Sequence, residues 1–125
     1  MSVALLRRIG FQSSGTFSLD TTGRVIIRRE QLPQEPGVYA FVDRGVAYIG
    51  HTAQGTLDRR VRSYLLKNYQ AHRPVGEGLK KALKERGRVR IMTLPVRPRL
   101  WKELEITDTF GIEQALLKRL KPPWN

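Results

Sequence analysis

The sequence contains no cysteine and only two histidines. The absence of cysteine excludes disulfide bonds, thiolate zinc sites, iron–sulfur clusters and cysteine nucleophiles, and it is consistent with a reducing compartment. The two histidines, His51 and His72, are too few for a histidine-rich metal site and leave most nucleophilic triads incomplete. Any chemistry in this chain therefore has to come from tyrosine, arginine and carboxylate side chains.

Long apolar runs are lacking as well. The longest ones, such as residues 37–42, are far shorter than the ~18 residues that indicate a membrane span. Residues 1–10 lack the apolar centre of a secretory signal peptide. We therefore expect a soluble, cytoplasmic protein with no membrane partner.

Acidic residues are scarce: 11 of them face 23 lysines and arginines, which gives a net charge of +12. Residues 59–99 hold thirteen of the basic residues and only Glu77 and Glu85 as acids, so this segment carries +11. Such a charge predicts a polyanionic partner, which we expect to be DNA, with RNA not excluded. A basic face that serves solubility alone is the alternative.

The 125 residues fit a single domain, and a hydrophobic content of 40% is enough to form a core. Short alternating segments on either side of residues 20–23 predict a possible β-hairpin near the N-terminus. The prolines of residues 32–36 then predict an extended connector. We expect an N-terminal extension over residues 1–35 and the functional domain over residues 36–125.

Residues 36–125 show both β-strand and helix patterns. β-branched and aromatic runs around a turn predict a hairpin, apolar residues at helical spacing predict helices, and a third strand ends at Pro95. The predicted strands cover residues 37–42, 46–52 and 88–94, and the predicted helices cover residues 57–68, 78–86 and about 108–120. A polar loop is predicted between the last strand and the last helix, so the element order is ββααβα.

Two tyrosines in the predicted hairpin are candidate site residues. Tyr39 follows Gly37 by two residues, and Tyr48 precedes Gly50 by two. Glycine lacks a β-carbon and permits the close approach of a ligand. The alternative is that both tyrosines simply pack on one face of a sheet, which is common for strand residues.

The helix predicted after the hairpin places Arg60 and Tyr64 four residues apart, so both side chains share one face. The planar guanidinium of an arginine matches phosphate oxygens and stabilises charge that develops during phosphoryl transfer. The alternative is that Arg59, Arg60 and Arg62 only hold nucleic acid or stay in solvent. The spacing favours Arg60.

Glu113 is the acid with the clearest structural context. It shares a helical stripe with Leu117 and Leu120, which places a carboxylate at the edge of an apolar face. A divalent cation is one candidate partner, because magnesium and manganese prefer hard oxygen ligands. Favourable charge near a helix N-terminus is the alternative explanation.

Together these residues resemble the GIY-YIG nuclease family over residues 37–125, about seven tenths of the chain. The resemblance rests on six anchors in the family's order, which are Gly37-Val38-Tyr39, Tyr48-Ile49-Gly50, Arg60, Tyr64, Glu113 and Asn125. The segment around Arg60 and Tyr64 is similar to the incision subunit of bacterial nucleotide excision repair. His51 departs from the pattern, because the repair subunit usually has lysine there. The loop before the helix is one residue longer than in the repair relatives, and Arg59 would be the family's arginine in place of Arg60 if the register differs.

The resemblance implies an α/β (α+β) fold, with a small, three-stranded, mainly antiparallel sheet flanked by helices. It implies a DNA endonuclease of repair or recombination that hydrolyses phosphodiester bonds with one divalent cation, Mg or Mn, held by Glu113. Tyr39 is expected to be the general base toward the attacking water, directly or through a second water, and Tyr48 to position that water or the phosphate. Arg60 is expected to neutralise the phosphate with support from Tyr64, and Asn125 to order Tyr39 or the local backbone.

Basic side chains outside these anchors are expected to bind nucleic acid. They are His51, Arg59, Arg62, Lys67, Lys80, Lys81 and Lys84. The competing interpretation is a non-catalytic, basic nucleic-acid-binding module or subunit with the same fold. The two interpretations differ in their need for Glu113, since a carboxylate facing phosphate repels it unless a cation intervenes.

Overall fold

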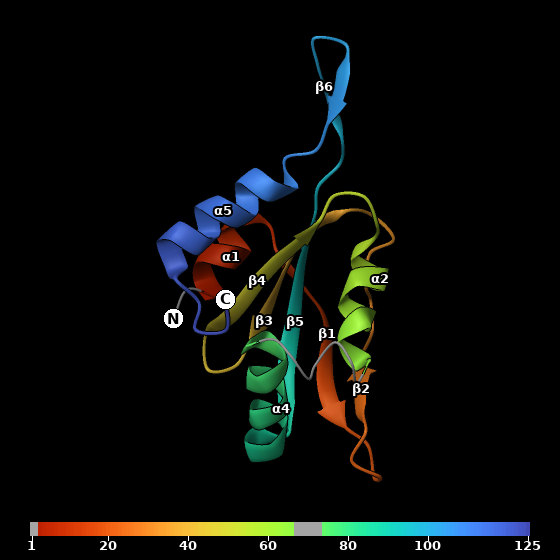
Figure 1. The fold of residues 1–125 in the computed structure, drawn as a ribbon, viewed down its shortest axis with the longest axis vertical. Helices are drawn as coiled ribbons and strands as arrows, with labels where there is room; N and C mark the ends of the chain where they lie inside the picture. The colour runs from red at the N-terminus through yellow and green to blue at the C-terminus, as the bar shows by residue number, and fades with distance from the viewer. Residues whose placement is uncertain (1–2, 67–73) are drawn as a thin grey trace.

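The computed structural model describes residues 3–66 and 74–125 (Figure 1). Its elements combine one antiparallel sheet with helices on both sides and one small separate hairpin. In chain order they are α1 (Val3–Ile9), β1 (Gln12–Leu19), β2 (Val25–Arg28), β3 (Gly37–Val42), β4 (Val46–Thr52), α2 (Leu57–Arg62), the 3-10 helix η1 (Ser63–Leu65), α4 (Pro74–Arg86), β5 (Arg88–Pro95), β6 (Arg99–Trp101), β7 (Leu104–Ile106) and α5 (Thr109–Leu120).

The main sheet has five strands in the order β2-β1-β5-β3-β4, and every neighbouring pair is antiparallel. The mixed α+β class and the antiparallel sheet flanked by helices are therefore confirmed, but the expected number of three strands is wrong. The N-terminal hairpin, β1 and β2, pairs with β5 and adds two strands. Residues 12–16 are mostly polar, so their strand depends on backbone pairing with β5, which hydrophobic alternation does not reveal.

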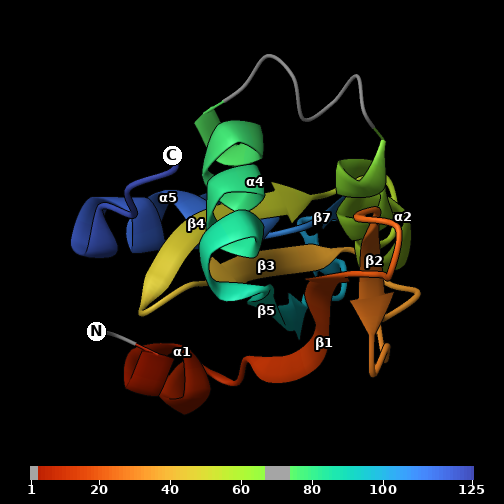
Figure 2. The ribbon, with the colours of Figure 1, turned by 90° about the horizontal axis from the view of Figure 1, so that it is seen from below.

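Alternate residues of the central strands enter two separate cores. Tyr39 and Phe41 of β3 pack with residues of α2 and α4, while Val38, Ala40 and Val42 pack with residues of α1 and α5. All six residues of β3 are buried, which explains why the strand is apolar without alternation. Figure 2 shows α2 and α4 above the sheet, α1 below it, and α5 beside β4.

The helices follow the sequence prediction closely. The segment predicted as a helix over residues 57–68 is α2 followed by η1, and residues 67 and 68 lie outside the described part of the chain. The helix predicted from residue 78 begins earlier, at Pro74, because proline is tolerated in a first helical turn. Gly87 ends it with a positive φ of 79°, as the sequence predicts. Lys121, with left-handed backbone, ends α5 before Pro122.

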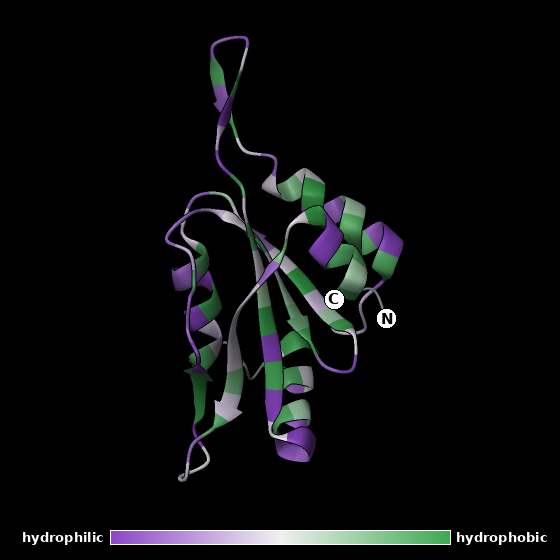
Figure 3. Cartoon of the chain, turned by 180° about the vertical axis from the view of Figure 1, so that it is seen from behind, coloured by the Kyte–Doolittle hydropathy of each residue, from purple (hydrophilic) through white to green (hydrophobic). Residues whose placement is uncertain are grey.

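Two elements were not predicted. Helix α1 covers Val3–Ile9, and the region predicted as a polar loop contains the β6–β7 hairpin, which projects from the body in Figure 1. Its strands have three residues each, too few for a recognisable alternation. Figure 3 shows hydrophobic colour along the central strands and both colours on the helices. Among the described residues, no helix combines the length and apolarity of a membrane span.

Candidate active site

Strand β4 lies at one edge of the sheet and carries several of the predicted site residues. It pairs with β3 so that Tyr39 lies opposite Gly50, and Phe41 lies opposite Tyr48. The two motifs of the family resemblance therefore face each other on neighbouring strands. The pairing places both tyrosines on the side of the sheet that α2 and α4 cover.

Tyr39, Tyr48 and Tyr64 form a compact group that we call the phenol cluster. The hydroxyls of Tyr39 and Tyr64 are 2.6 Å apart, and the Tyr64 hydroxyl donates to the Tyr48 hydroxyl at 3.4 Å. The ring centroids form a triangle with sides of 6.0, 6.1 and 6.2 Å. Positions 39, 48 and 64, separated in sequence, thus share one hydrogen-bonded group.

Gly50 makes room for this cluster. A β-carbon at this position would overlap the Tyr39 ring and hydroxyl, so a larger residue would displace the phenol. Tyr39 and Tyr64 are fully buried, whereas Tyr48 is half-buried. Of the three phenols, Tyr48 is therefore the one that retains contact with solvent.

Helix α2 brings Arg60 to the phenol cluster. The Thr56 side chain accepts a hydrogen bond from the Arg59 amide. The first two amides of the helix, those of Leu57 and Asp58, donate to carbonyls of the predicted connector, at Glu35 and Pro33 respectively. These bonds satisfy amide groups that a helix leaves without an internal partner. The Arg60 Nε group donates to the Tyr39 hydroxyl at 3.3 Å, and this contact favours Arg60 over Arg59, which is exposed.

Burial dominates the electrostatics of the cluster. Desolvation raises the pKa of Tyr39 well above its usual range, and the nearby Tyr48 raises it further, while Arg60 opposes the shift. Burial also raises the pKa of Tyr64, with additional contributions from Tyr39 and Tyr48. The loss of hydration therefore outweighs the guanidinium of Arg60, so these surroundings do not favour the Tyr39 phenolate that a general base requires.

Glu113 approaches the same strand from α5. His51 Nδ1 donates to Glu113 Oε2 at 2.8 Å, and the Gln114 amide donates to Glu113 Oε1 at 3.2 Å. Tyr48 and His51 are three residues apart on β4, so their side chains point to opposite faces. The site is thus in two parts across the edge strand, with the phenol cluster on one side and the His51–Glu113 pair on the other, a division that residue spacing did not reveal.

The oxygen atoms near Glu113 suit a hard cation. Thr109 is buried one helical turn before Glu113, and its hydroxyl is the buried side-chain atom that lacks a hydrogen-bond partner within the described residues. A hydrated divalent cation needs one or two carboxylates, with water and substrate oxygens completing its shell. No group of three or more His, Asp or Glu side chains that could hold a metal occurs in residues 3–66 and 74–125, so the donor set fits this open kind of site and not a closed one.

Asn125 holds β4 from its outer side. Its Oδ1 accepts from the Ile49 amide at 2.9 Å, and its Nδ2 donates to the Ile49 carbonyl at 2.8 Å. The Trp124 amide donates to the Ala47 carbonyl at 2.8 Å. This segment therefore occupies backbone groups that an edge strand would otherwise expose, between Tyr48 and Gly50.

The basic residues predicted to bind nucleic acid lie in several places. Exposed ones are Arg59 on α2 and Lys80, Lys81 and Lys84 on α4. Arg62 forms ion pairs with Asp58 and Glu30, which reduces its availability to phosphate, and His51 is engaged with Glu113. Lys67 lies outside the described residues.

No protein-family model matches the sequence, and no curated protein matches it. The structure resembles a mutant of bacteriophage T4 EndoII with a TM-score of 0.76 and 20% identity, over 98% of this chain and 96% of the other. With the two motifs paired on neighbouring strands, this likeness decides the fold. The chain has a GIY-YIG nuclease-like fold.

Two further solved structures resemble this GIY-YIG nuclease-like chain. Restriction endonuclease HPY188I in complex with product DNA has a TM-score of 0.54 and 16% identity, over 94% of this chain and 79% of the other. A point mutant of the GIY-YIG N-terminal endonuclease domain of UvrC from Thermotoga maritima, bound to its catalytic divalent cation, has a TM-score of 0.48 and 25% identity, over 75% and 86%.

Proposed function

We propose that this protein is a divalent-metal-dependent endonuclease that hydrolyses phosphodiester bonds of DNA. The observation that carries the proposal is the contact of Arg60 with the phenol cluster at the edge strand that also receives Glu113. Hydrophobic packing alone does not explain why a guanidinium and three phenol hydroxyls lie together in the structure. DNA as substrate is supported by the charge of +12 and by the DNA bound to HPY188I.

Each side chain of the site has a separate role in this proposal. Arg60 neutralises the phosphate and stabilises charge that develops on it. Tyr48, the half-buried phenol, contacts the attacking water or the phosphate. Tyr39 is buried, so in this proposal it does not take a proton directly from water; it holds Arg60 and Tyr64 in place through its hydroxyl.

Glu113 would hold the cation, Mg or Mn, with Thr109 as a second oxygen on the same side of α5. When bound, the cation supplies Lewis-acid polarisation of the scissile phosphate. His51 orients the Glu113 carboxylate through the hydrogen bond to Oε2. Asn125 keeps the backbone between Tyr48 and Gly50 in register.

A non-catalytic DNA-binding module is the second candidate. It is favoured by one observation, the engagement of Glu113 with His51 and Gln114, which satisfies the carboxylate without a cation. A binding module needs none of the phenol hydroxyls, whereas the nuclease needs Arg60 and Glu113 together.

The test is incubation of the protein with supercoiled plasmid and Mg²⁺ or Mn²⁺, with EDTA and Glu113→Ala as controls. We expect nicking by the wild type, no nicking in EDTA, and a loss of several orders of magnitude in Glu113→Ala. Equal nicking by wild type and Glu113→Ala would exclude Glu113 as the metal ligand. Tight binding of DNA by a folded wild type that does not nick any form of DNA would favour the binding module.

A further inference from the structure

An open groove of about 950 Å³ lies away from the candidate active site. It is lined by residues of β1, β2, β5, the β3–β4 turn and the C-terminal end of α4. Its charged lining residues are Arg28, Arg29, Asp43, Arg44, Arg86, Arg88 and Arg90. Six arginines minus one aspartate leave a charge of +5 in one concave surface.

The charge of the groove is largely uncompensated. Asp43 is engaged by Arg86 through two hydrogen bonds, from Nε to Oδ1 at 2.7 Å and from Nη2 to Oδ2 at 2.5 Å. The other five arginines have no carboxylate partner among the residues that the structure describes. Guanidinium groups that line one groove repel one another, and a bound anion reduces the repulsion.

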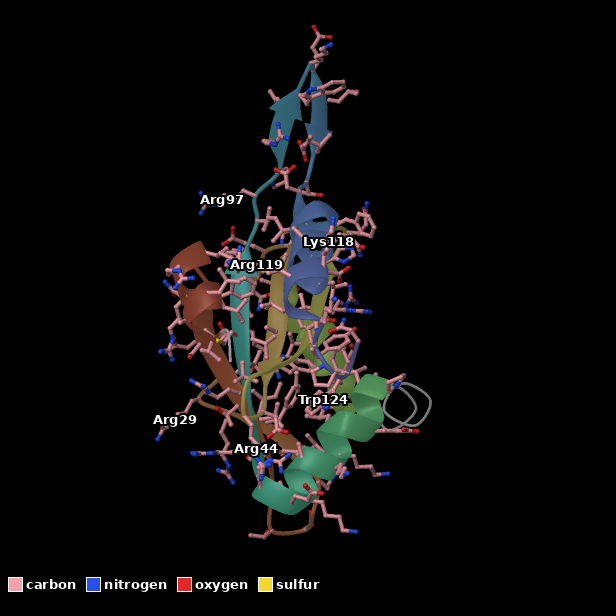
Figure 4. All side chains as sticks on the ribbon, turned by 90° about the vertical axis from the view of Figure 1, so that its left-hand side faces the viewer. Arg29, Arg44, Arg97, Lys118, Arg119 and Trp124 are labelled. Atoms are coloured by element: carbon pink, nitrogen blue, oxygen red, sulfur yellow. The ribbon has the colours of Figure 1, made fainter. Side chains whose placement is uncertain are left out.

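The backbone adds a second sign of a binding site. Arg29 and Arg44 have φ values of 53° and 63°, in the left-handed region that is unfavourable for a residue with a long side chain. Asn or Gly would adopt this conformation with less strain. Both strained positions line the groove, and Figure 4 shows them well away from Lys118 and Arg119 of α5.

The shape of the groove favours a chain of phosphates over a single one. Its lining reaches from β2 across β1 and β5 to the end of β3, three strand spacings or roughly 14 Å. One nucleic-acid strand presents a phosphate about every 3.4 Å along the duplex axis. The groove therefore has room for several consecutive phosphates, and its arginines match them bidentately.

The groove lies on the sheet face opposite the phenol cluster. Phe17 and Val89 pack in the core that contains Tyr39, so their neighbours Thr16, Ser18, Arg88 and Arg90 point to the other face. We propose that this arginine groove binds the phosphate backbone of DNA outside the cleavage site. The inference goes beyond phosphodiester hydrolysis, since this contact needs neither Glu113 nor a cation.

The test measures binding without cleavage. A short labelled DNA duplex is titrated with protein in EDTA over a series of salt concentrations, with circular dichroism as the check of folding. Arg88→Gln with Arg90→Gln is expected to weaken binding and to reduce the slope of log Kobs against log salt by about 2, since each phosphate contact contributes about 0.9. Lys118→Gln with Arg119→Gln removes the same charge from α5 and is expected to leave the slope unchanged.

Equal effects of the two double variants, or no effect of either, would overturn the proposal. So would a groove variant that binds the duplex normally but no longer binds inorganic tripolyphosphate, because the ligand would then be a small anion. If the groove variant does not fold, the test is made on the wild type instead, by following the Nε–Hε NMR signals of Arg88 and Arg90. They are expected to shift when duplex is added, and unmoved signals would reject the site.

Discussion

The Arg60 guanidinium contacts the buried Tyr39 hydroxyl at 3.3 Å, while its neighbour Arg59 is exposed on the same short helix. Sequence spacing favours Arg60, and a shift of one residue in the preceding loop would instead have favoured Arg59. The contact with Tyr39 supports Arg60, and not Arg59, as the arginine of the candidate site. In the proposed mechanism, Arg60 would act on the phosphate from the fixed position that this contact gives it, which a solvated arginine would not have.

Replacement of Arg60 by alanine is expected to lower the single-turnover rate of plasmid nicking by about 10²- to 10³-fold, the usual effect of removing one donor to developing charge. The rate is measured at saturating protein, so that a change in affinity does not contribute. Arg59→Ala is the matched control and should keep the rate. A larger loss in Arg59→Ala than in Arg60→Ala would reverse the assignment.

The buried phenols predict a dependence of stability on alkaline pH. Burial raises the pKa values of Tyr39 and Tyr64, whereas tyrosines of the unfolded chain ionise near pH 10. The stabilisation is therefore complete below about pH 10 and is lost as the pH rises above it.

The free energy of unfolding is expected to fall by up to about 1.4 kcal/mol per pH unit for each such phenol above pH 10. Tyr64→Phe should show a shallower fall, measured by urea denaturation from pH 9 upward. Lysine ionisation affects both proteins equally and cancels in the comparison. Parallel curves for the two proteins would contradict the proposed burial.

Strand β4 is the element on which the candidate site depends, and it lies at the edge of the sheet. Edge strands fray more easily than central ones, because one side of their backbone lacks a neighbouring strand. Asn125 and Trp124 occupy part of that side. Gly78 of α4 makes room for the Trp124 indole, since a β-carbon there would collide with it.

Asn125→Ala is expected to destabilise the protein by about 1–3 kcal/mol, because it removes two hydrogen bonds to Ile49. Hydrogen exchange should show faster exchange of the Ile49 amide, and nicking should slow as Tyr48 loses its fixed position. Asn125→Asp keeps the acceptor but places a carboxylate oxygen against the Ile49 carbonyl, which it repels. Its effects should therefore be comparable to those of Asn125→Ala. Unchanged exchange at Ile49 would reject the role of Asn125 in holding β4.

The whole sheet depends on the N-terminal hairpin. Strand β1 lies between β2 and β5, and its Phe17 is fully buried with its ring 5.1 Å from that of Phe41. Phe41 in turn packs edge-on against Tyr64 at 5.0 Å. The first 35 residues therefore help to hold the phenol cluster in place, because Phe17 packs on Phe41 and Phe41 packs on Tyr64.

A fragment of residues 36–125 is expected to remain unfolded or to aggregate, because it leaves β5 as an open edge and removes Phe17 from the core. Circular dichroism and urea denaturation measure the result. The control replaces residues 98–107 by a short Gly-Ser linker, since the β6–β7 hairpin has mostly exposed side chains. The control should unfold cooperatively, and a fragment that does the same would establish residues 36–125 as an independent domain.

Much of the main domain is predictable from local pattern. Strands β3 and β4, helix α5 and the end of α4 at Gly87 follow from β-branched runs, helical spacing and a glycine stop, because these signals depend on neighbouring residues. The sequence indicates the N-terminal hairpin only weakly, through two short alternating segments. Helix α1, the β6–β7 hairpin and the pairing of the N-terminal hairpin with β5 lie beyond local pattern, since short segments carry little pattern and the pairing joins residues far apart in the sequence.

The sequence by itself determined the kinds of side chain available for chemistry and their order along the chain, because composition excludes thiol sites and histidine-rich metal sites and the motifs name the tyrosines, the arginine and the glutamate. Tertiary structure alone decided which of them meet. It joined Tyr39, Tyr64 and Arg60, paired Glu113 of α5 with His51 of β4, and gathered arginines from β5, the end of β2, the β3–β4 turn and the end of α4 into one groove. Contacts between distant segments depend on strand order and on the face to which each side chain points, and neither is encoded locally.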